Sequence, residues 1–403
     1  MLSYEDVLAA REHVEQVAVR TPVNYSHSFS ELTGAAINLK LENTQRTGAF
    51  KIRGAMNRIA ALTDEERERG VVTASAGNHA QGVALAATRA GVDSTIVMPK
   101  YAPVSKVEAT RRYGGEVVLH GIDYDEAQGH AHEIEREQDK VYVHAFEDER
   151  VMAGQGTIGL EIAEQCPDVD TVVVPIGGGG LISGVATALK GALDDVRVVG
   201  VQAAGADSAA RSVREGRRVE LGGVDTVADG IAVREVGEHT FPYIRERVDE
   251  VVTVDDEAIA ETLTLLLERS KTVVEGAGAV ALAAVLEETF EYEEGEVIVP
   301  ALCGGNIDMN TLITVILRGL VRMGRYLKVS LELKDRPGEL ERVAGIIARE
   351  DANVYALSHD RTSRDIAVDA ADLEIELETH GHEHAAEVVA ALEEAGYEVD
   401  VEA

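Results

Sequence analysis

Lys51 stands where a positive charge is unfavourable unless something compensates it. It lies in the segment NTQRTGAFKIRGA, residues 43–55, directly before a run that predicts the start of a helix. The helix macrodipole favours anions at this end and disfavours a cation. A lysine bound as an imine to the aldehyde of a cofactor would remove the conflict. The segment therefore indicates cofactor chemistry at Lys51, and the rest of the chain has to supply the cofactor site.

Four consecutive glycines, Gly177 to Gly180, lie between a predicted buried strand and a predicted helix. Four glycines cost backbone entropy, so an ordinary loop rarely contains them. Bare N–H groups at a helix N-terminus form an anion site that suits phosphate. A P-loop needs Lys-Ser/Thr after its last glycine, but Val185 follows Gly184 here, and G-x-G-x-x-G does not fit. The run favours one phosphate monoester on a small cofactor; a tight turn without ligand is the alternative.

Two further polar clusters follow predicted strands. Ser75, Gly77, Asn78 and His79 lie in TASAGNHAQG, where a strand gives way to a helix, and Cys303 follows a buried strand in PALCGGN. Open α/β sheets bind ligands at such strand ends, so the first cluster could receive a substrate carboxylate. Ordinary helix capping is the alternative for Ser and Asn, and a small core residue is the alternative for the cysteine.

The elements that must position these residues alternate between strand and helix. From residue 70 to 120, and again around the glycine run and Cys303, short apolar strands alternate with helical segments that end in glycine. This rhythm predicts mostly parallel α/β sheets. After about residue 324 the pattern becomes βαββαβ, which predicts a ferredoxin-like module over residues 325–403.

The composition excludes several classes of partner. The chain has 403 residues, enough for two or three domains, and a formal net charge of -34. Such a charge repels nucleic acid and anionic membranes. Only nine of the 38 basic residues are lysines, and an evenly acidic, lysine-poor surface is typical of a salt-rich cytoplasm. The alternative is simply an acidic cytosolic enzyme.

The small number of cysteines predicts a protein without a cysteine metal site. The lack of a signal region and of an apolar run as long as a membrane span predicts a cytoplasmic protein. Cys166 and Cys303 allow no disulfide framework or CxxC metal site, and we find no signal region or membrane span. The histidine-rich run HGHEH, residues 380–384, has no standard metal-ligand spacing and is predicted to be a solvated loop.

Four motifs occur together in one order: TGAFKIRGA at 47–55, SAGNHAQG at 75–82, GGGGLISG at 177–184 and CGGN at 303–306. With them the chain resembles the fold-type II family of pyridoxal-phosphate enzymes, and most closely the threonine ammonia-lyases (threonine dehydratases). The resemblance implies a tryptophan synthase beta-like α/β fold with two open subdomains. It implies a catalytic domain over residues 1–324, with a small subdomain at about 50–150 inserted in the larger one. The tail, residues 325–403, resembles an ACT domain.

The resemblance also implies roles for individual residues. Lys51 would bind the pyridoxal phosphate aldehyde and move the substrate Cα proton, and Phe50 would lie against the cofactor ring. Asn78 would hydrogen-bond the ring hydroxyl, and Cys303 would face the pyridine nitrogen. The phosphate would be bound by Gly177, Gly178, Gly179, Gly180 and Leu181. The substrate carboxylate would be bound by Ser75, Gly77, Asn78 and His79.

The implied reaction is deaminating dehydration of L-threonine to 2-oxobutanoate and ammonia, and of L-serine to pyruvate. A thiol at the pyridine nitrogen favours elimination, and Ala76 stands where racemases of the family have a second serine. Gln202 and Ser208 stand where those relatives have acidic ligands for a divalent cation, so no divalent site is expected, and a monovalent ion is the alternative. Serine dehydratase, serine racemase, threonine synthase and a catalytically silent amino-acid sensor are the alternatives.

The tail resemblance implies regulation. The turn DRPGEL, residues 335–340, would place Pro337 and Gly338 at an effector site, with a branched-chain amino acid as effector. Family members are usually homodimers or homotetramers. The residues do not distinguish a role in isoleucine synthesis from one in threonine degradation.

We expect the protein to be more active and more stable in high salt. A net charge of -34 repels itself unless it is screened, and the Debye length falls from about 10 Å at 0.1 M to about 3 Å at 1 M ionic strength. Activity and melting temperature, measured in KCl from low to molar concentration, should rise together. A flat or falling profile would support the plain acidic enzyme instead.

Overall fold

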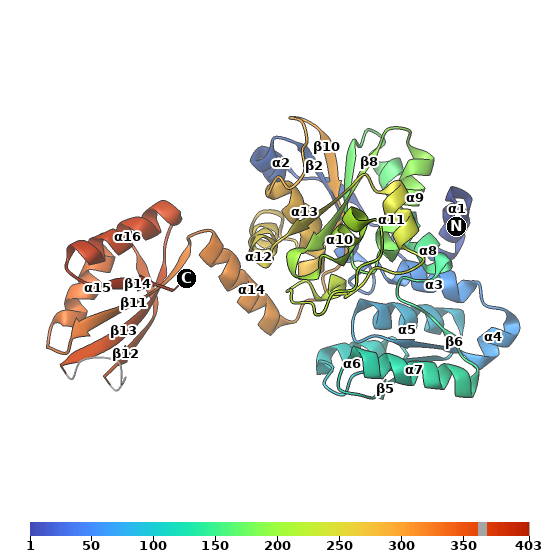
Figure 1. Ribbon diagram of the computed structural model, residues 1–403, viewed down its shortest axis with the longest axis horizontal. Helices are drawn as coiled ribbons and strands as arrows, with labels where there is room; N and C mark the ends of the chain where they lie inside the picture. The colour runs from blue at the N-terminus through green and yellow to red at the C-terminus, as the bar shows by residue number, and fades with distance from the viewer. Residues whose placement is uncertain (362–368, 403) are drawn as a thin grey trace. The chain divides into compact units, whose positions relative to one another are not determined.

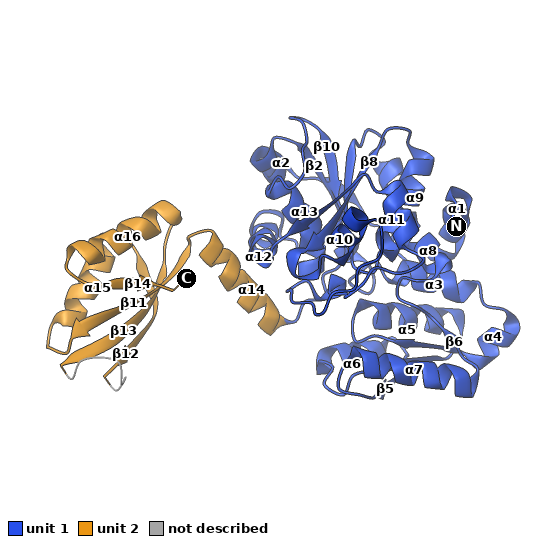
Figure 2. Ribbon diagram, in the orientation of Figure 1, with its two compact units in different colours: residues 1–308 blue, residues 309–403 orange. Residues whose placement is uncertain are grey.

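The chain forms two compact units. The computed structural model describes residues 1–361 and 369–402. The N-terminal unit is Met1–Asp308 and the C-terminal unit is Met309–Ala403 (Figure 2). The division falls before helix α14 (Met309–Arg322), whereas the predicted boundary between catalytic and regulatory domains lies after it. That functional boundary stays a prediction.

The larger sheet of the N-terminal unit has six strands. Its order is β1 (Val23–Tyr25), β2 (Ala36–Lys40), β10 (Val297–Pro300), β7 (Thr171–Pro175), β8 (Arg197–Ala203) and β9 (Glu250–Val254). Only the edge strand β1 runs antiparallel to its neighbour. All five residues of β7 are buried, because helices cover both faces of a parallel sheet. The strand therefore reads as the uninterrupted apolar run TVVVP in the sequence.

The smaller sheet has four parallel strands. Their order is β5 (Glu116–Leu119), β4 (Ser94–Met98), β3 (Val71–Ala74) and β6 (Val141–Tyr142). These strands come between β2 and β7 in the chain, so the smaller sheet is an insertion within the larger one (Figure 1). This arrangement agrees with the two open α/β subdomains expected from the sequence.

Helices α5 and α9 begin where buried strands end. Helix α5 follows β3, and α9 follows β7.

The helices of the N-terminal unit are α1 (Tyr4–Val14), α2 (His27–Thr33), α3 (Ile52–Ala60), α4 (Asp64–Arg69), α5 (Asn78–Ala90), α6 (Val104–Arg112), α7 (Tyr124–Gln138), α8 (Glu149–Gln165), α9 (Gly180–Ala192), α10 (Ser208–Glu215), α11 (Phe241–Arg247), α12 (Asp256–Leu265) and α13 (Gly276–Leu286). Shorter helical turns are η1 (Glu42–Thr44), η2 (Ala204–Ala206), η3 (Asp229–Ile231) and η4 (Leu266–Ser270).

The C-terminal unit contains the predicted βαββαβ module. After α14 its elements are β11 (Tyr326–Lys334), α15 (Glu339–Arg349), β12 (Asn353–Asp360), β13 (Ala370–Glu378), α16 (His382–Glu394) and β14 (Val399–Val401). The sheet order is β12-β13-β11-β14, with antiparallel neighbours, as in a ferredoxin-like fold. Alternate residues of β11 and β13 are buried against the helices, which matches the alternation seen in the sequence.

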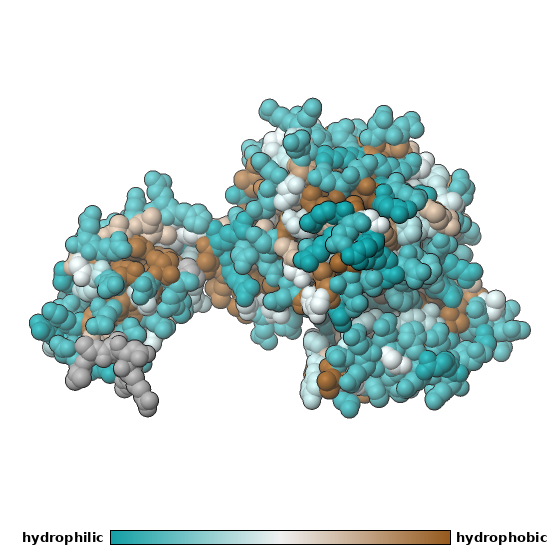
Figure 3. Space-filling view, in the orientation of Figure 1, coloured by the Kyte–Doolittle hydropathy of each residue, from teal (hydrophilic) through white to brown (hydrophobic). Residues whose placement is uncertain are grey.

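Hydrophilic residues cover most of the visible surface of each unit (Figure 3). Within residues 1–361 and 369–402, no helix is both long enough and apolar enough to cross a membrane.

Candidate functional site

One cavity of the N-terminal unit gathers the predicted catalytic and binding residues. It has a volume of about 530 Å³ and is lined by the turns that follow β3, β7 and β10. The predicted residues in its lining are Phe50, Lys51, Ser75, Gly77, Asn78, His79, Gly177, Gly178, Gly179, Gly180, Leu181 and Cys303. Residues more than 250 positions apart in the chain therefore meet at one place.

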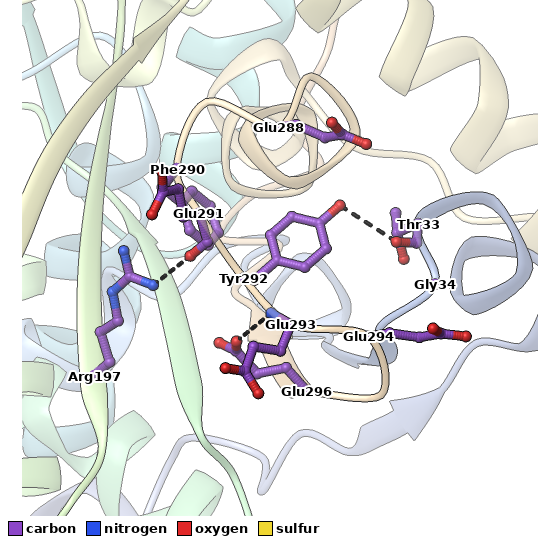
Figure 4. A pocket seen from close by; sticks show the side chains of 10 residues that line it. All are labelled: Thr33, Gly34, Arg197, Glu288, Phe290, Glu291, Tyr292, Glu293, Glu294 and Glu296. Atoms are coloured by element: carbon purple, nitrogen blue, oxygen red, sulfur yellow. Dashed lines mark hydrogen bonds between the residues drawn. The ribbon is translucent and has the colours of Figure 1, made fainter.

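A second hollow of the N-terminal unit, about 960 Å³ in volume, contains none of these residues (Figure 4). Five of its ten lining residues are glutamates, and its cation Arg197 is paired with Glu250. Arg197 also donates to the backbone oxygen of Glu291 at 2.6 Å. A lining rich in carboxylates repels phosphate and carboxylate ligands, so this hollow is not a candidate for the predicted chemistry.

Lys51 immediately precedes helix α3, at its N-cap position, as the sequence predicts. Its Nζ donates a hydrogen bond to the backbone oxygen of Ala145 at 3.1 Å and lies 5.1 Å from the centroid of the Phe50 ring. Burial lowers the pKa of Lys51 to about 8, although Cys303 and Glu275 oppose the shift. More free amine is then present near neutral pH than for an ordinary lysine, and in that form the side chain can accept a proton.

The glycine run turns its carbonyl groups into the protein. The Gly178 oxygen accepts from the Gly237 N–H at 3.1 Å and from the Thr240 hydroxyl at 2.6 Å. The Gly179 oxygen accepts from the Ser183 hydroxyl at 2.7 Å. Gly179 is the N-cap of α9, with φ of 94° and no capping side chain. The first N–H groups of α9 lack intrahelical partners and are therefore suited to an anion.

The run also packs too closely against its surroundings for any side chain. A Cβ at Gly178 would lie 2.5 Å from ring atoms of Phe146, and one at Gly180 would lie 2.7 Å from the Phe146 Cβ. A Cβ at Gly177 would lie 3.1 Å from the Ile231 Cα. Packing therefore excludes side chains at Gly178 and Gly180 and leaves only tight room at Gly177, so the backbone of the run can lie directly along the cavity.

Glu275 is a lining residue that the sequence analysis missed. It is the N-cap of α13, and its Oε1 accepts a hydrogen bond from Asn78 Nδ2 at 2.6 Å. Asn306 Nδ2 donates to Asn78 Oδ1 at 2.8 Å, so both ends of the Asn78 amide are held. Burial raises the pKa of Glu275, and the Asn78 hydrogen bond opposes the shift. One acid in the apolar run TVVEGAGAVALAAVL was the available signal.

One ring nitrogen of His79 is bound within the protein, and the other, Nδ1, is buried without a hydrogen-bond partner among the described residues. Its Nε2 contacts the backbone oxygen of Val143 at 2.9 Å, and burial, with Lys51 nearby, lowers its pKa to about 3. A neutral imidazole adds no positive charge for a carboxylate. The Gly77 N–H donates to Ser75 Oγ at 3.1 Å, and no side chain caps α5 at Gly77. The groups left for an anion at this turn are the first N–H groups of α5 and the Ser75 hydroxyl, which can still donate its hydrogen.

Cys303 is a buried, uncharged thiol in the cavity lining. Its Sγ contacts the backbone oxygen of Ala301 at 3.3 Å. Burial raises the pKa of the thiol well above its usual value, and the carboxylates of Glu42 and Glu275 raise it further. Cys303 therefore offers a neutral group to whatever it faces.

Other lining residues come from segments without a sequence signal. Tyr124 and Asp125 lie at the start of α7, while Asp229 and Arg234 come from the segment after α10. Arg234 Nη1 lies 4.0 Å from Asp125 Oδ2, and its Nη2 is paired more closely with Glu220 at 2.8 Å. No motif in the sequence pointed to these residues.

The histidine run corrects one expectation. His382 to His384 form the first turn of α16 instead of a loop, and His384 Nε2 hydrogen-bonds the backbone oxygen of Glu350. In the part of the chain that the structure describes, no cluster of three His, Cys, Asp or Glu residues could hold a metal ion. The predicted effector residues Pro337 and Gly338 lie before α15 in the C-terminal unit.

Residues 14–304 match the family described as pyridoxal-phosphate dependent enzyme. The chain belongs to this family. This finding confirms the family, the fold class and the cofactor, pyridoxal phosphate, that the four motifs indicated. The cavity fits such a cofactor, because it combines a lysine of lowered pKa with an uncapped glycine cradle.

Known members of the family resemble this pyridoxal-phosphate enzyme closely. An L-threonine ammonia-lyase of Thermotoga maritima is 48% identical over 401 residues, which cover 100% of each chain. The structure of processed threonine deaminase isoform 2 from Solanum lycopersicum matches with a TM-score of 0.75 and 42% identity, covering 77% of this chain and 85% of that one. Maize serine racemase matches with a TM-score of 0.75 and 38% identity, covering 79% and 98%.

We expect Gly178→Ala to weaken pyridoxal phosphate binding by about tenfold or more, because overpacking typically costs about 1–3 kcal/mol. The added Cβ would meet the Phe146 ring and shift the glycine run. The dissociation constant can be measured by titrating the apoenzyme and following cofactor absorbance.

Gly129→Ala is the matched control, since a Cβ there, on helix α7, meets nothing within 4 Å. It should bind the cofactor like the wild type. Equal affinity of the two variants would mean that the run is not part of the cofactor site.

Proposed function

We propose that this enzyme is a threonine ammonia-lyase that converts L-threonine to 2-oxobutanoate and ammonia, and also converts L-serine to pyruvate. The observation that carries the proposal is the 48% identity over the full length of both chains to the Thermotoga lyase. The chemistry of the cavity supports it, because a lysine of lowered pKa and a neutral thiol line the same space.

The proposed roles follow from the contacts of each side chain. Lys51 would bind the cofactor aldehyde, and Gly177 to Leu181 would bind the phosphate through N–H groups. Bound pyridoxal phosphate supplies a place for the negative charge that develops at the substrate Cα. The free amine of Lys51 would take the Cα proton, and its lowered pKa suits this work near neutral pH.

The remaining residues would position the cofactor ring and the substrate. The Asn78 amide, fixed by Glu275 and Asn306, would meet the ring hydroxyl. N–H groups at the start of α5, together with Ser75, would bind the substrate carboxylate. The neutral thiol of Cys303 would leave the pyridine nitrogen without a full proton. That limits charge delocalisation and favours rapid loss of the β-hydroxyl.

Racemisation is the competing reaction, and the similarity to maize serine racemase makes it a real alternative. A racemase needs proton carriers on both faces of Cα. Ala76, beside Ser75 in the turn before α5, has no group that can carry a proton. We therefore propose elimination as the main reaction on both threonine and serine.

The decisive experiment measures 2-oxo acids and D-amino acids after incubation with L-threonine and L-serine separately. Threonine should give the higher kcat/KM, and D-serine should stay below pyruvate. Lys51→Ala should lower kcat on the order of 10²–10⁴-fold, because a general base is lost. The exposed Lys100→Ala is the control and should keep wild-type activity. More D-serine than pyruvate would make the enzyme a racemase.

We further propose that the C-terminal unit is an ACT domain that binds an amino-acid effector beside Pro337 and Gly338. The full-length match to the Thermotoga lyase includes this unit. Gly338 is the N-cap of α15, with φ of 96° and open space around it, so a ligand could approach the backbone. The first candidates for the effector are isoleucine as inhibitor and valine as its opponent. The proposal includes a role of the enzyme in isoleucine synthesis. It also includes assembly of the chain into homodimers or homotetramers.

Threonine saturation curves with isoleucine, valine and leucine test this regulation. Gly338→Ala should abolish the response, since its Cβ would occupy the space of the ligand. Gly396→Ala is the matched control, because that glycine also has φ near 95° and open space. If the wild-type chain ignores every amino acid tried, the unit has only a structural role.

We also propose that the protein works in a salt-rich cytoplasm. The acidic, lysine-poor composition supports a salt-rich cytoplasm, and the expected rise of activity with KCl tests that adaptation.

A further inference from the structure

The side chain of His144 holds a tight turn between β6 and α8, residues 144–147. Its Nδ1 accepts hydrogen bonds from the N–H groups of Phe146 at 3.2 Å and of Glu147 at 2.9 Å. One acceptor that binds the N–H groups two and three residues ahead fixes a turn, as Asn and Asp side chains do. The conformation of the turn therefore depends on this ring nitrogen.

Two residues of the turn contact the proposed cofactor site. The backbone oxygen of Ala145 accepts the hydrogen bond of Lys51 Nζ at 3.1 Å. The ring of Phe146 packs against the glycine run, so that a Cβ at Gly178 would lie 2.5 Å from it. The turn thus contacts both the lysine and the phosphate loop.

Glu147 connects the turn to the glycine run by a second route. Its Oε2 accepts from the backbone N–H of His239 at 3.1 Å and contacts His239 Nδ1 at 2.6 Å. In the same segment, the Gly237 N–H donates to the Gly178 oxygen at 3.1 Å. Gly237 also lies so close to Glu147 that a Cβ there would be 1.4 Å from Oε1.

We propose that His144 is a positioning residue for the cofactor: by fixing the 144–147 turn, it sets the place of Lys51 relative to the glycine run. The inference rests on the proposed assignment of the cofactor to this cavity. It adds a residue that lies outside the cavity lining and acts through Ala145, Phe146 and Glu147.

The surroundings keep the ring nitrogen available as an acceptor. Burial lowers the pKa of His144 to about 4, with Lys51 and His132 adding to the shift and Glu147 and Asp148 opposing it. The ring also packs edge-on against Phe146, with centroids 4.6 Å apart, and tilted against Tyr142 at 6.0 Å. Two substitutions separate the role of the acceptor nitrogen from that of the ring.

His144→Phe keeps the ring and removes the acceptor, whereas His144→Asn loses the ring and keeps an acceptor that suits this turn. We expect His144→Phe to raise the dissociation constant for pyridoxal phosphate about tenfold and to change the visible circular dichroism of the bound cofactor. His144→Asn should restore both to near the wild-type values. The readouts are apoenzyme titration and the spectrum, measured without substrate.

His132→Phe is the control, since this histidine also stacks on Tyr142 but its Nδ1 contacts Glu135 instead of a turn. It should bind the cofactor like the wild type. Wild-type affinity in His144→Phe, or equal weakening in His144→Phe and His144→Asn, would overturn the inference. Failure of the cofactor assignment is distinguishable, because Gly178→Ala would then also bind normally.

Discussion

A buried cluster of ion pairs around Arg53 organises the N-terminal unit. Arg53, two residues after Lys51, is 1% exposed and shares its guanidinium between the carboxylates of Glu42 and Glu161 at 2.7 Å each. Lys40 adds a second cation to Glu161 at 2.6 Å. Loss of one member of such a group typically costs about 3–5 kcal/mol, because a buried charge is left unpaired. The helix that carries Lys51 is thereby tied to η1, β2 and α8.

The contact between α3 and α8 depends on glycines as well as on ion pairs. Gly54 follows Arg53 and faces α8, where a Cβ would lie 2.5 Å from Gln155 Nε2. Gly154 on α8 approaches α3 equally closely, with a Cβ only 2.6 Å from the Arg53 oxygen. Helix α3 can therefore lie directly on α8, and the lysine at its N-terminus is set by backbone contact as well as by ion pairs.

The residues that sequence reasoning found stand in motifs of several informative residues, whereas those it missed have a single weak local signal or none. Lys51, Asn78, Gly177 to Gly180 and Cys303 each stand at a strand or helix end, where residue type and neighbours are informative in one short segment. Glu275 and His144 reach the cavity through contacts that only the fold creates. The Asn78–Glu275 bond joins residues 197 positions apart. The βαββαβ pattern was readable for the same local reason, because β11 and β13 alternate in burial.

The position of β10 has a consequence for how the chain acquires its structure. This strand lies between β2 and β7, pairing Val297 with Ala36 and Ile298 with Thr171. The larger sheet therefore lacks an interior strand until residue 300 has been synthesised. The strands of the smaller sheet all lie within residues 71–142, so that sheet requires only nearby sequence. Such long-range closure slows folding. A ribosome-bound chain that ends at residue 296 would have every strand of the smaller sheet but no continuous larger sheet, and no thiol at position 303.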